Sequence, residues 1–269
     1  MKFSATRLQR ILAEPPVPFR MGDYISRSFK FMNENLGLLI AFTIITYVIN
    51  FFCQSLPYVG IFLGVAISPI LSIGYSQFTY RVKRGHRPDF GEFFKGFTKI
   101  GPLILTYILT LVISLLALLP GLIIWYKAGT LEWLVEMQAA YPLFQDIPDL
   151  RDMVDMSLFW IGLAVMFIGG VAVSLLFIWA LKIVWFFEVG PLEAIEASRK
   201  LIARNWGEML GFIIIVGLIT ISGVLVCGIG LLYTAPAMAI AIFFAFADAT
   251  RILEDSEEDQ PDLIDHFIA

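Results

Sequence analysis

The sequence predicts an all-α, polytopic membrane protein, and three observations support this fold class. The 269 residues are 58% hydrophobic and 16% charged, with a mean hydropathy of +0.80, whereas soluble domains are about 45–50% apolar and about 25% charged. The apolar residues are concentrated in runs of about 20 residues, the length that a helix needs to cross a bilayer. These runs show no alternation of apolar and polar residues, which argues against a β-barrel.

Six runs are long enough to span a membrane. Backbone polar groups in lipid must be paired within their own segment, so each run is expected to be a helix. The predicted spans are 36–54, 59–80, 102–125, 157–187, 209–227 and 228–247, which form three hairpins. The fourth run is longer than one crossing requires, so it is expected to tilt or to project beyond the bilayer. Gly169-Gly170 in its middle indicates close helix contact or a bend.

The basic residues orient the chain. With both termini inside, the inner segments contain all of the 19 Lys and Arg except Lys127 and Arg151, as the positive-inside rule requires. We therefore predict N-in and C-in topology in a bacterial cytoplasmic (inner) membrane, without a cleavable signal peptide. The expected organisation is a cytoplasmic leader with an interfacial helix (1–34), a six-helix membrane domain (35–253) with an outer insert (126–156), and an acidic cytoplasmic tail (254–269).

An internal repeat is indicated by one pattern, S-x-K-x4-N-x-G, which occurs before the first hairpin and again before the third. Its members are Ser28, Lys30, Asn35 and Gly37 in the first copy, and Ser198, Lys200, Asn205 and Gly207 in the second. Both copies lie on the predicted inner side, so the repeat is parallel rather than inverted. The middle hairpin is preceded by a looser version that begins at Phe90 and ends at Gly101.

Each of these lead-in segments is predicted to be an amphipathic helix. An apolar stripe at helical spacing recurs in both copies, consisting of Ile25, Ser28 and Met32 in the first and Ile195, Ser198 and Ile202 in the second. Aromatic and aliphatic residues on one face with Lys and Arg on the other are typical of a helix in the headgroup plane. A connector that tucks against the bundle is the alternative.

The motif residues have structural interpretations that we favour over functional ones. Ser28 and Ser198 are small residues that would allow close helix approach, and the alternative is a catalytic or ligand-binding role. Asn35 and Asn205 are expected to cap helix junctions together with the glycines that follow, and the alternative is a polar ligand site.

Pro69 and Pro236 occupy comparable places in the second spans of the first and third hairpins. They are candidate helix breaks, and interrupted helices at corresponding positions of two halves can mark a transporter binding site. Proline kinks are also common in helices that transport nothing, and the surroundings of both prolines are apolar.

No pattern in the sequence indicates catalysis, a cofactor or a bound metal. The span centres contain no charged residue, which disfavours a proton relay. Asp146, Asp149, Asp152 and Asp155 recur every third residue, so on a helix they would not converge as the ligands of a calcium loop do; Asp149 is instead a plausible helix cap. Cys53 and Cys227 both fall near the outer ends of spans, and whether they pair is left open.

The run 188–198, followed by Asn205-Trp206-Gly207 and a hairpin that contains Gly and Pro, resembles a family of uncharacterised bacterial six-helix membrane proteins. That family is similar to the membrane domain fused to some glycerophosphoryl diester phosphodiesterases. The resemblance implies a six-helix membrane fold. It does not transfer the phosphodiesterase activity, because this chain has no corresponding soluble domain, and it supplies no catalytic residues.

These observations favour a non-enzymatic membrane protein that organises lipids or partner proteins at the cytoplasmic face. The predicted partners are anionic lipids of the inner leaflet, which basic interfacial residues attract, and a protein partner for the acidic tail; no nucleic acid is expected. The alternative function is a transporter or channel for a lipid or another small apolar substrate.

Overall fold

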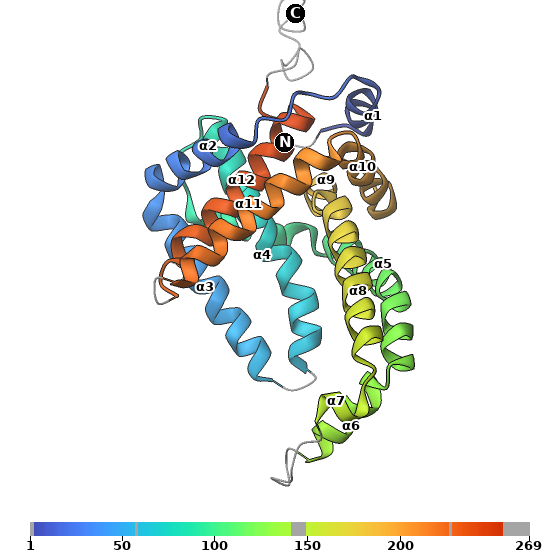
Figure 1. The fold of residues 1–269 in the computed structure, drawn as a ribbon. Helices are drawn as coiled ribbons and strands as arrows, with labels where there is room; N and C mark the ends of the chain where they lie inside the picture. Colours follow the sequence, from blue (N-terminus) through green and yellow to red (C-terminus); the bar gives the residue numbers. More distant parts are fainter. Residues whose placement is uncertain (1–2, 57–58, 141–148, 226–227, 255–269) are drawn as a thin grey trace, which may run out of the picture. The chain divides into compact units, whose positions relative to one another are not determined.

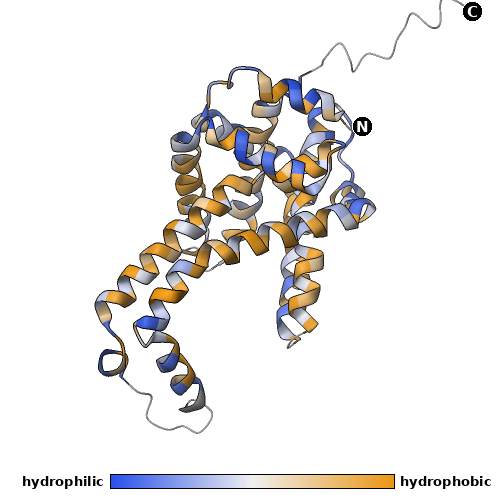
Figure 2. Ribbon diagram, turned by 90° about the vertical axis from the view of Figure 1, so that its right-hand side faces the viewer, coloured by the Kyte–Doolittle hydropathy of each residue, from blue (hydrophilic) through white to orange (hydrophobic). Residues whose placement is uncertain are grey.

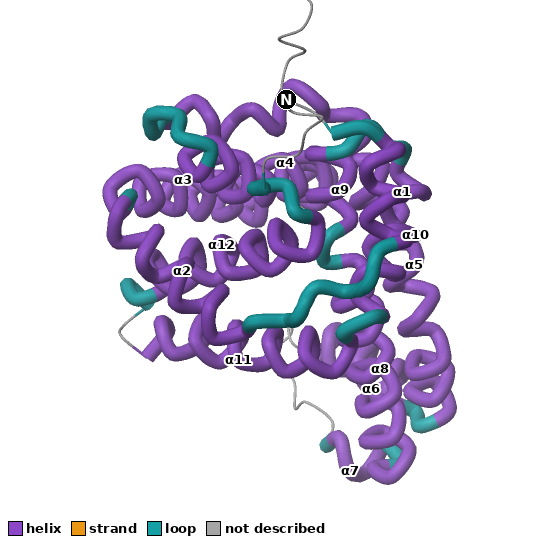
Figure 3. The backbone as a smooth tube through the Cα atoms, turned by 90° about the horizontal axis from the view of Figure 1, so that it is seen from above, coloured by secondary structure: helices purple, strands orange, loops and turns teal. Residues whose placement is uncertain are grey.

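The computed structural model describes residues 3–56, 59–140, 149–225 and 228–254. Within these residues every element of regular secondary structure is a helix (Figure 3). The only β-type pairing among them is one isolated bridge between Phe3 and Phe187. The chain divides into two units, one made of Met1–Thr106 with Trp179–Ala269 and the other of Tyr107–Ile178. The all-α fold class is confirmed.

Six helical segments are long and apolar enough to cross a membrane, which confirms a polytopic architecture. They are α3 (Leu36–Ser55), α4 (Val59–Lys83), α5 (Ile100–Lys127), α8 (Met156–Phe177) with its continuation α9 (Ala180–Phe186), α11 (Trp206–Leu225) and α12 (Leu231–Thr250) (Figure 1). Each begins and ends within a few residues of its predicted bounds, except the fourth.

The fourth run is interrupted rather than simply long. A turn at Ile178 and Trp179 separates α8 from α9, and the boundary between the two units falls between these same residues. The run is therefore two helices joined by a turn, and its tilt or projection beyond the bilayer stays a prediction. Helix α8 is continuous through Gly169 and Gly170. A β-carbon placed on Gly169 would lie 3.0 Å from the Ala117 carbonyl oxygen, which fits the predicted close helix contact.

Four shorter helices lie outside the spans of the first unit: α1 (Ala5–Ala13), α2 (Met21–Glu34), the 3-10 helix η1 (Phe90–Lys99) and α10 (Pro191–Ala203). Ser4 and Asp89 cap α1 and η1 through their side chains, and Pro191 opens α10 with a preset backbone angle. The lead-in segments are thus helical, as predicted, including the looser middle one.

Each lead-in helix packs on a second span of another hairpin. Helix α2 lies along α12, η1 along α4, and α10 along α9 (Figure 1). The first lead-in therefore contacts the third hairpin, the second contacts the first, and the third contacts the second. We call the part of the first unit where these three contacts are made the lead-in end. The parallel repeat itself stays a prediction.

An aromatic cluster forms the core of the lead-in end. The ring of Phe93 stacks between Phe42 and Phe78, with both centroid distances at 4.3 Å. Phe31 meets Phe78 edge to face and also contacts Phe244. All five rings are fully buried, so η1 is held on the spanning helices by close packing as well as by burial.

The outer surface of the spanning helices remains apolar. Phe51, Phe62 and Leu225 are 68%, 76% and 84% exposed, and Figure 2 shows the long helices mainly in the hydrophobic colour. Exposed apolar surface this extensive is unusual for a soluble monomer. It is the surface expected of helices that face lipid.

The second unit contains a helical hairpin of α5 and α8, with α6 (Thr130–Ala140) and α7 (Leu150–Met153) between them. The rings of Trp125 and Phe159 stack at 5.4 Å, and the Trp125 indole N–H donates to the Phe159 carbonyl oxygen at 3.1 Å. The Asp149 side chain accepts a hydrogen bond from the Arg151 amide, which confirms its predicted capping role.

Close approach in this hairpin depends on Gly162. A β-carbon there would lie 2.5 Å from Trp125 Cδ1, so Gly162→Ala is expected to lower the free energy of unfolding by about 1–3 kcal/mol, the usual cost of overpacking. Denaturation in mild detergent measures this change. At Gly170 the nearest atom would be 3.7 Å away, so Gly170→Ala should leave stability unchanged or raise it. Equal stability of the two variants would contradict the close contact.

Candidate functional site

The serines of the repeat motif are both fully buried, Ser28 on α2 and Ser198 on α10. The Ser28 hydroxyl donates to the Ile25 carbonyl oxygen at 2.7 Å within its own helix. Met32 and Ile202 of the two apolar stripes are buried as well. These stripes face other helices of the protein, so they are not available for insertion into lipid. The predicted interfacial placement would have to depend on outward residues such as Leu192, which is 69% exposed.

Asn35 lies at the predicted junction, as the C-cap residue of α2 and the residue directly before α3. Asn35 precedes α3 without a side-chain capping bond, and its amide instead donates to the Phe31 carbonyl oxygen at 3.1 Å. The Asn205 amide donates to the Val17 carbonyl oxygen at 3.4 Å. Gly37 and Gly207 lie within regular turns of α3 and α11, so neither relieves backbone strain. Asn35 thus stabilises the last turn of α2, and Asn205 holds the leader at Val17.

Lys30 and Lys200 are both exposed. Lys200 lies 3.5 Å from Glu196, whose carboxylate also accepts two hydrogen bonds from Arg199, at 2.7 and 2.8 Å. The hydrogen bond from Arg199 lowers the pKa of Glu196 to about 2. The carboxylate is therefore charged at neutral pH, and this part of α10 carries a net charge of about +1.

Pro69 and Pro236 are buried, and α4 and α12 run through them as continuous helices. Neither proline therefore ends its helix, and a kink at either position stays a prediction. The chain also has Pro120 inside α5, so proline within a span is not confined to the first and third hairpins. Neither Pro69 nor Pro236 lines either of the two cavities described below.

The leader forms a strap across α10 and the end of α12 that sequence reasoning did not predict. It begins where the Phe3 amide donates to the Phe186 carbonyl oxygen and the Glu188 amide donates to the Phe3 carbonyl oxygen, both at 2.9 Å. Arg204 then donates to three carbonyl oxygens at the end of α1, those of Ile11, Leu12 and Glu14. Cations at a helix C-terminus satisfy its unpaired carbonyl groups.

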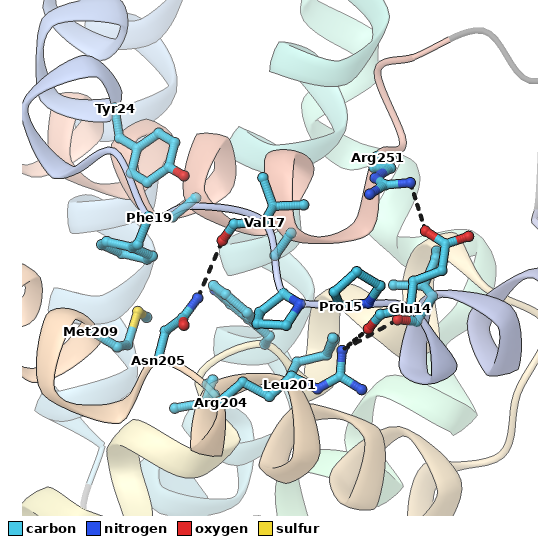
Figure 4. A pocket seen from close by; sticks show the side chains of 16 residues that line it. Glu14, Pro15, Val17, Phe19, Tyr24, Leu201, Arg204, Asn205, Met209 and Arg251 are labelled. Atoms are coloured by element: carbon cyan, nitrogen blue, oxygen red, sulfur yellow. Dashed lines mark hydrogen bonds and ion pairs between the residues drawn. The ribbon is translucent and has the colours of Figure 1, made fainter.

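A cavity lies between this strap and the helices beneath it. Figure 4 shows Pro15, Val17 and Phe19 of the leader facing Leu201 and Met209, while Arg251 reaches the Glu14 carboxylate, 2.6 Å away. The cavity has a volume of about 30 Å³, which suffices for only a few waters. The only sequence signal for this arrangement was the segment Pro15-Pro16-Val17-Pro18, which excludes a helix from that stretch.

A second and larger cavity, of about 390 Å³, lies between the C-terminal part of α4, η1 and α9. Three of its seven lining residues are basic and none is acidic, so we call it the basic cavity. Its lining residues are Gln77, Tyr80, Arg81, Lys95, Thr98, Lys99 and Trp185. In the sequence these lysines and the arginine belong to the predicted inner-face charges, and no local pattern predicts that they converge.

Glu92 organises the cations of the basic cavity although its own side chain is only 8% exposed. One carboxylate oxygen lies 2.7 Å from Lys95 Nζ and 3.6 Å from Arg81 Nε. The other oxygen accepts a hydrogen bond from the Gln77 amide at 2.8 Å, and Gln77 accepts one from the Trp185 indole N–H at the same distance. Glu92, Gln77 and Trp185 are thus joined by hydrogen bonds, which fixes the positions of their side chains.

In the described part of the chain no group of three or more His, Cys, Asp and Glu side chains could hold a metal ion. Cys53 is buried and is a free thiol in the structure; Cys227 and Asp146 lie outside the described residues. Comparison with protein-family models, with curated proteins and with solved structures gave no match to this chain.

Proposed function

We propose that the chain is a non-enzymatic protein of a bacterial cytoplasmic membrane, with both termini inside, that organises anionic lipids at its cytoplasmic face. We include in this proposal the resemblance to the membrane domain of certain phosphodiesterases, which concerns the six-helix architecture and not the activity. The observation that carries it is the lead-in end, where basic residues of the three lead-in helices meet the ends of the spanning helices that carry the apolar outer surface.

The exposed cations of the lead-in helices support this assignment. Lys30 on α2, Lys95 on η1 and Lys200 on α10 all reach solvent, and each basic residue near an anionic leaflet contributes about 1 kcal/mol of attraction. Exposed apolar residues border the same helices, among them Phe97 and Leu192. Basic and apolar residues in this combination are suited to the headgroup region.

Lipid enrichment around the protein tests the proposal. We expect the chain, reconstituted in mixed vesicles of phosphatidylglycerol and phosphatidylcholine, to enrich the anionic lipid among its neighbours. The triple variant Lys30→Gln/Arg199→Gln/Lys200→Gln should reduce that enrichment, because three exposed charges are lost. Lys127→Gln, at the predicted outer side, is the matched control. Equal enrichment of the two lipids around the unaltered chain would refute the proposal.

A protein partner for the acidic tail is a separate part of the proposal, since residues 255–269 lie outside the described residues. Seven acidic residues from Glu254 onward would be repelled by an anionic leaflet, which leaves them free for a basic partner. Chemical crosslinking followed by mass spectrometry, with and without residues 255–269, tests this part. Identical crosslinked proteins in both samples would remove the tail from the proposal.

A further inference from the structure

From the geometry of the basic cavity we infer that it is a specific binding site for one phosphate-bearing anionic group. The inference rests on the proposed function, which concerns lipids at the cytoplasmic face in general, and it assigns one defined site to that function. Its premises are the volume of the cavity, the balance of donors and acceptors in its wall, and the residues at its edge.

The wall of the basic cavity has more cationic donors than anionic acceptors. Arg81, Lys95 and Lys99 each carry one positive charge, and Glu92 beside them is the carboxylate that their network contains. Both oxygens of Glu92 are already engaged, one by Lys95 and the other by Gln77. Arg81 and Lys95 together with Glu92 therefore leave a net charge of about +1, which an anion with several oxygen acceptors would balance.

Arg81 carries the clearest sign of a missing acceptor. Its Nε is buried and has no hydrogen-bond acceptor within the described part of the chain, since the nearest Glu92 oxygen is 3.6 Å away. A buried donor without an acceptor is costly, and the guanidinium group is planar and suited to bidentate contact with phosphate. An anion in the cavity would supply the acceptor that the protein lacks there.

Lys99 is held against Trp185 in the wall of the same cavity. Its ammonium group donates to the Trp185 carbonyl oxygen at 3.0 Å and lies 5.5 Å from the centre of the Trp185 ring. The indole N–H of Trp185 is itself bonded to Gln77, so Lys99 and the Glu92 network are parts of one array. The cations are thus held in place before a ligand arrives, which lowers the entropic cost of binding.

The volume and the edge of the cavity indicate the size and source of the ligand. About 390 Å³ is within the range of small-molecule sites and exceeds the leader cavity roughly thirteenfold. Phe97 and Ile100, which flank Thr98 and Lys99 in sequence, are each 43% exposed. A lipid phosphate could therefore bind the cations while its acyl chains follow this apolar edge. Free phosphate shares the same chemistry and is the second source.

Native mass spectrometry of the full chain in mild detergent tests the site with phosphatidylglycerol as the probe. We expect one retained lipid per chain, and a loss of affinity of about tenfold or more in Arg81→Gln/Lys99→Gln, because charge-assisted hydrogen bonds are removed. Arg199→Gln/Lys200→Gln removes two cations from α10 and is the matched control, expected to remain within about twofold of the unaltered chain. Equal losses in the two double variants would overturn the inference.

A second variant keeps the test valid if the first one unfolds. Thr98→Glu places a carboxylate in the wall. It leaves the network of Glu92, Gln77 and Trp185 intact, because among the described residues the exposed Thr98 hydroxyl bonds to the Lys95 carbonyl oxygen and to no member of that network. It should abolish retention by repulsion; undiminished retention would overturn the site.

Inorganic phosphate distinguishes the two sources. If millimolar phosphate displaces the lipid, and lipid retention is lost in Arg81→Gln/Lys99→Gln, the site binds the phosphate group itself and a soluble ligand is supported. Retention despite phosphate, again lost in this double variant, supports a lipid headgroup. General enrichment of phosphatidylglycerol without this loss would overturn the site and leave the proposed function standing, whereas no enrichment at all would refute the proposed function.

Discussion

Phe93→Ala is expected to lower the free energy of unfolding by about 3–5 kcal/mol, the range for deleting a buried phenylalanine ring. Phe93 is fully buried and stacks on Phe42 and Phe78, each at a centroid distance of 4.3 Å. Alanine would leave a cavity between these two rings, which come from α3 and α4. Reversible unfolding in mixed micelles with increasing SDS measures the loss.

Phe97→Ala is the matched control for this prediction. Phe97 belongs to the same 3-10 helix but is 43% exposed, so its removal should cost less than about 1 kcal/mol. The contrast separates packing of η1 on the spanning helices from any change in the helix itself. Similar losses in the two variants would show that the stacked rings do not anchor η1. Because η1 forms one wall of the basic cavity, that result would also contradict a fixed geometry for the cavity.

The spanning helices could be predicted closely because one physical requirement determines them. Apolar runs of the necessary length must be helical in lipid, and flanking charges or polar residues mark their ends. Lys83 and Lys127, for example, are the last residues of α4 and α5. The interruption at Ile178 and Trp179 escaped prediction because neither residue is a helix breaker and the apolar run continues through both.

The lead-in helices were predictable as helices but not in their contacts. The stripe that contains Ser28 and Met32 would look the same whether it faced lipid or α12, since both are apolar. The structure shows that it faces protein. Periodicity identifies which face of a helix is buried and carries no information on the partner that buries it.

The basic cavity was beyond sequence analysis for a different reason. Arg81, Lys99 and Trp185 come from three segments of the chain, and no local spacing relates them. Only the packing of η1 on α4, and of α4 on α9, brings them together. The sequence shows an excess of basic residues on the predicted inner side. It does not show that Glu92 and Gln77 lie beside these cations, because those contacts arise from the tertiary structure.

The second large effect is expected from Arg204→Ala, which should release the leader from α10. Arg204 is the donor to three carbonyl oxygens at the end of α1, including that of Glu14 at 3.0 Å. Hydrogen bonds from charged groups contribute about 1.5–3 kcal/mol each, and α1 keeps other contacts through Phe3 and Arg251. A net loss of about 2–3 kcal/mol in leader docking corresponds to about 30- to 150-fold faster amide exchange in residues 3–20.

Hydrogen exchange followed by mass spectrometry resolves this effect, because the leader can open without global unfolding. Arg199→Ala is the control, since Arg199 bonds to Glu196 on its own helix and its exposed pair contributes little. Arg204→Lys should restore only part of the protection, because an ammonium group cannot reach three carbonyl oxygens as a guanidinium fork does. If exchange in residues 3–20 were the same in Arg204→Ala and Arg199→Ala, the strap would be held by α12 and the Phe3 bridge alone, and the Arg204 contacts would contribute nothing to its docking.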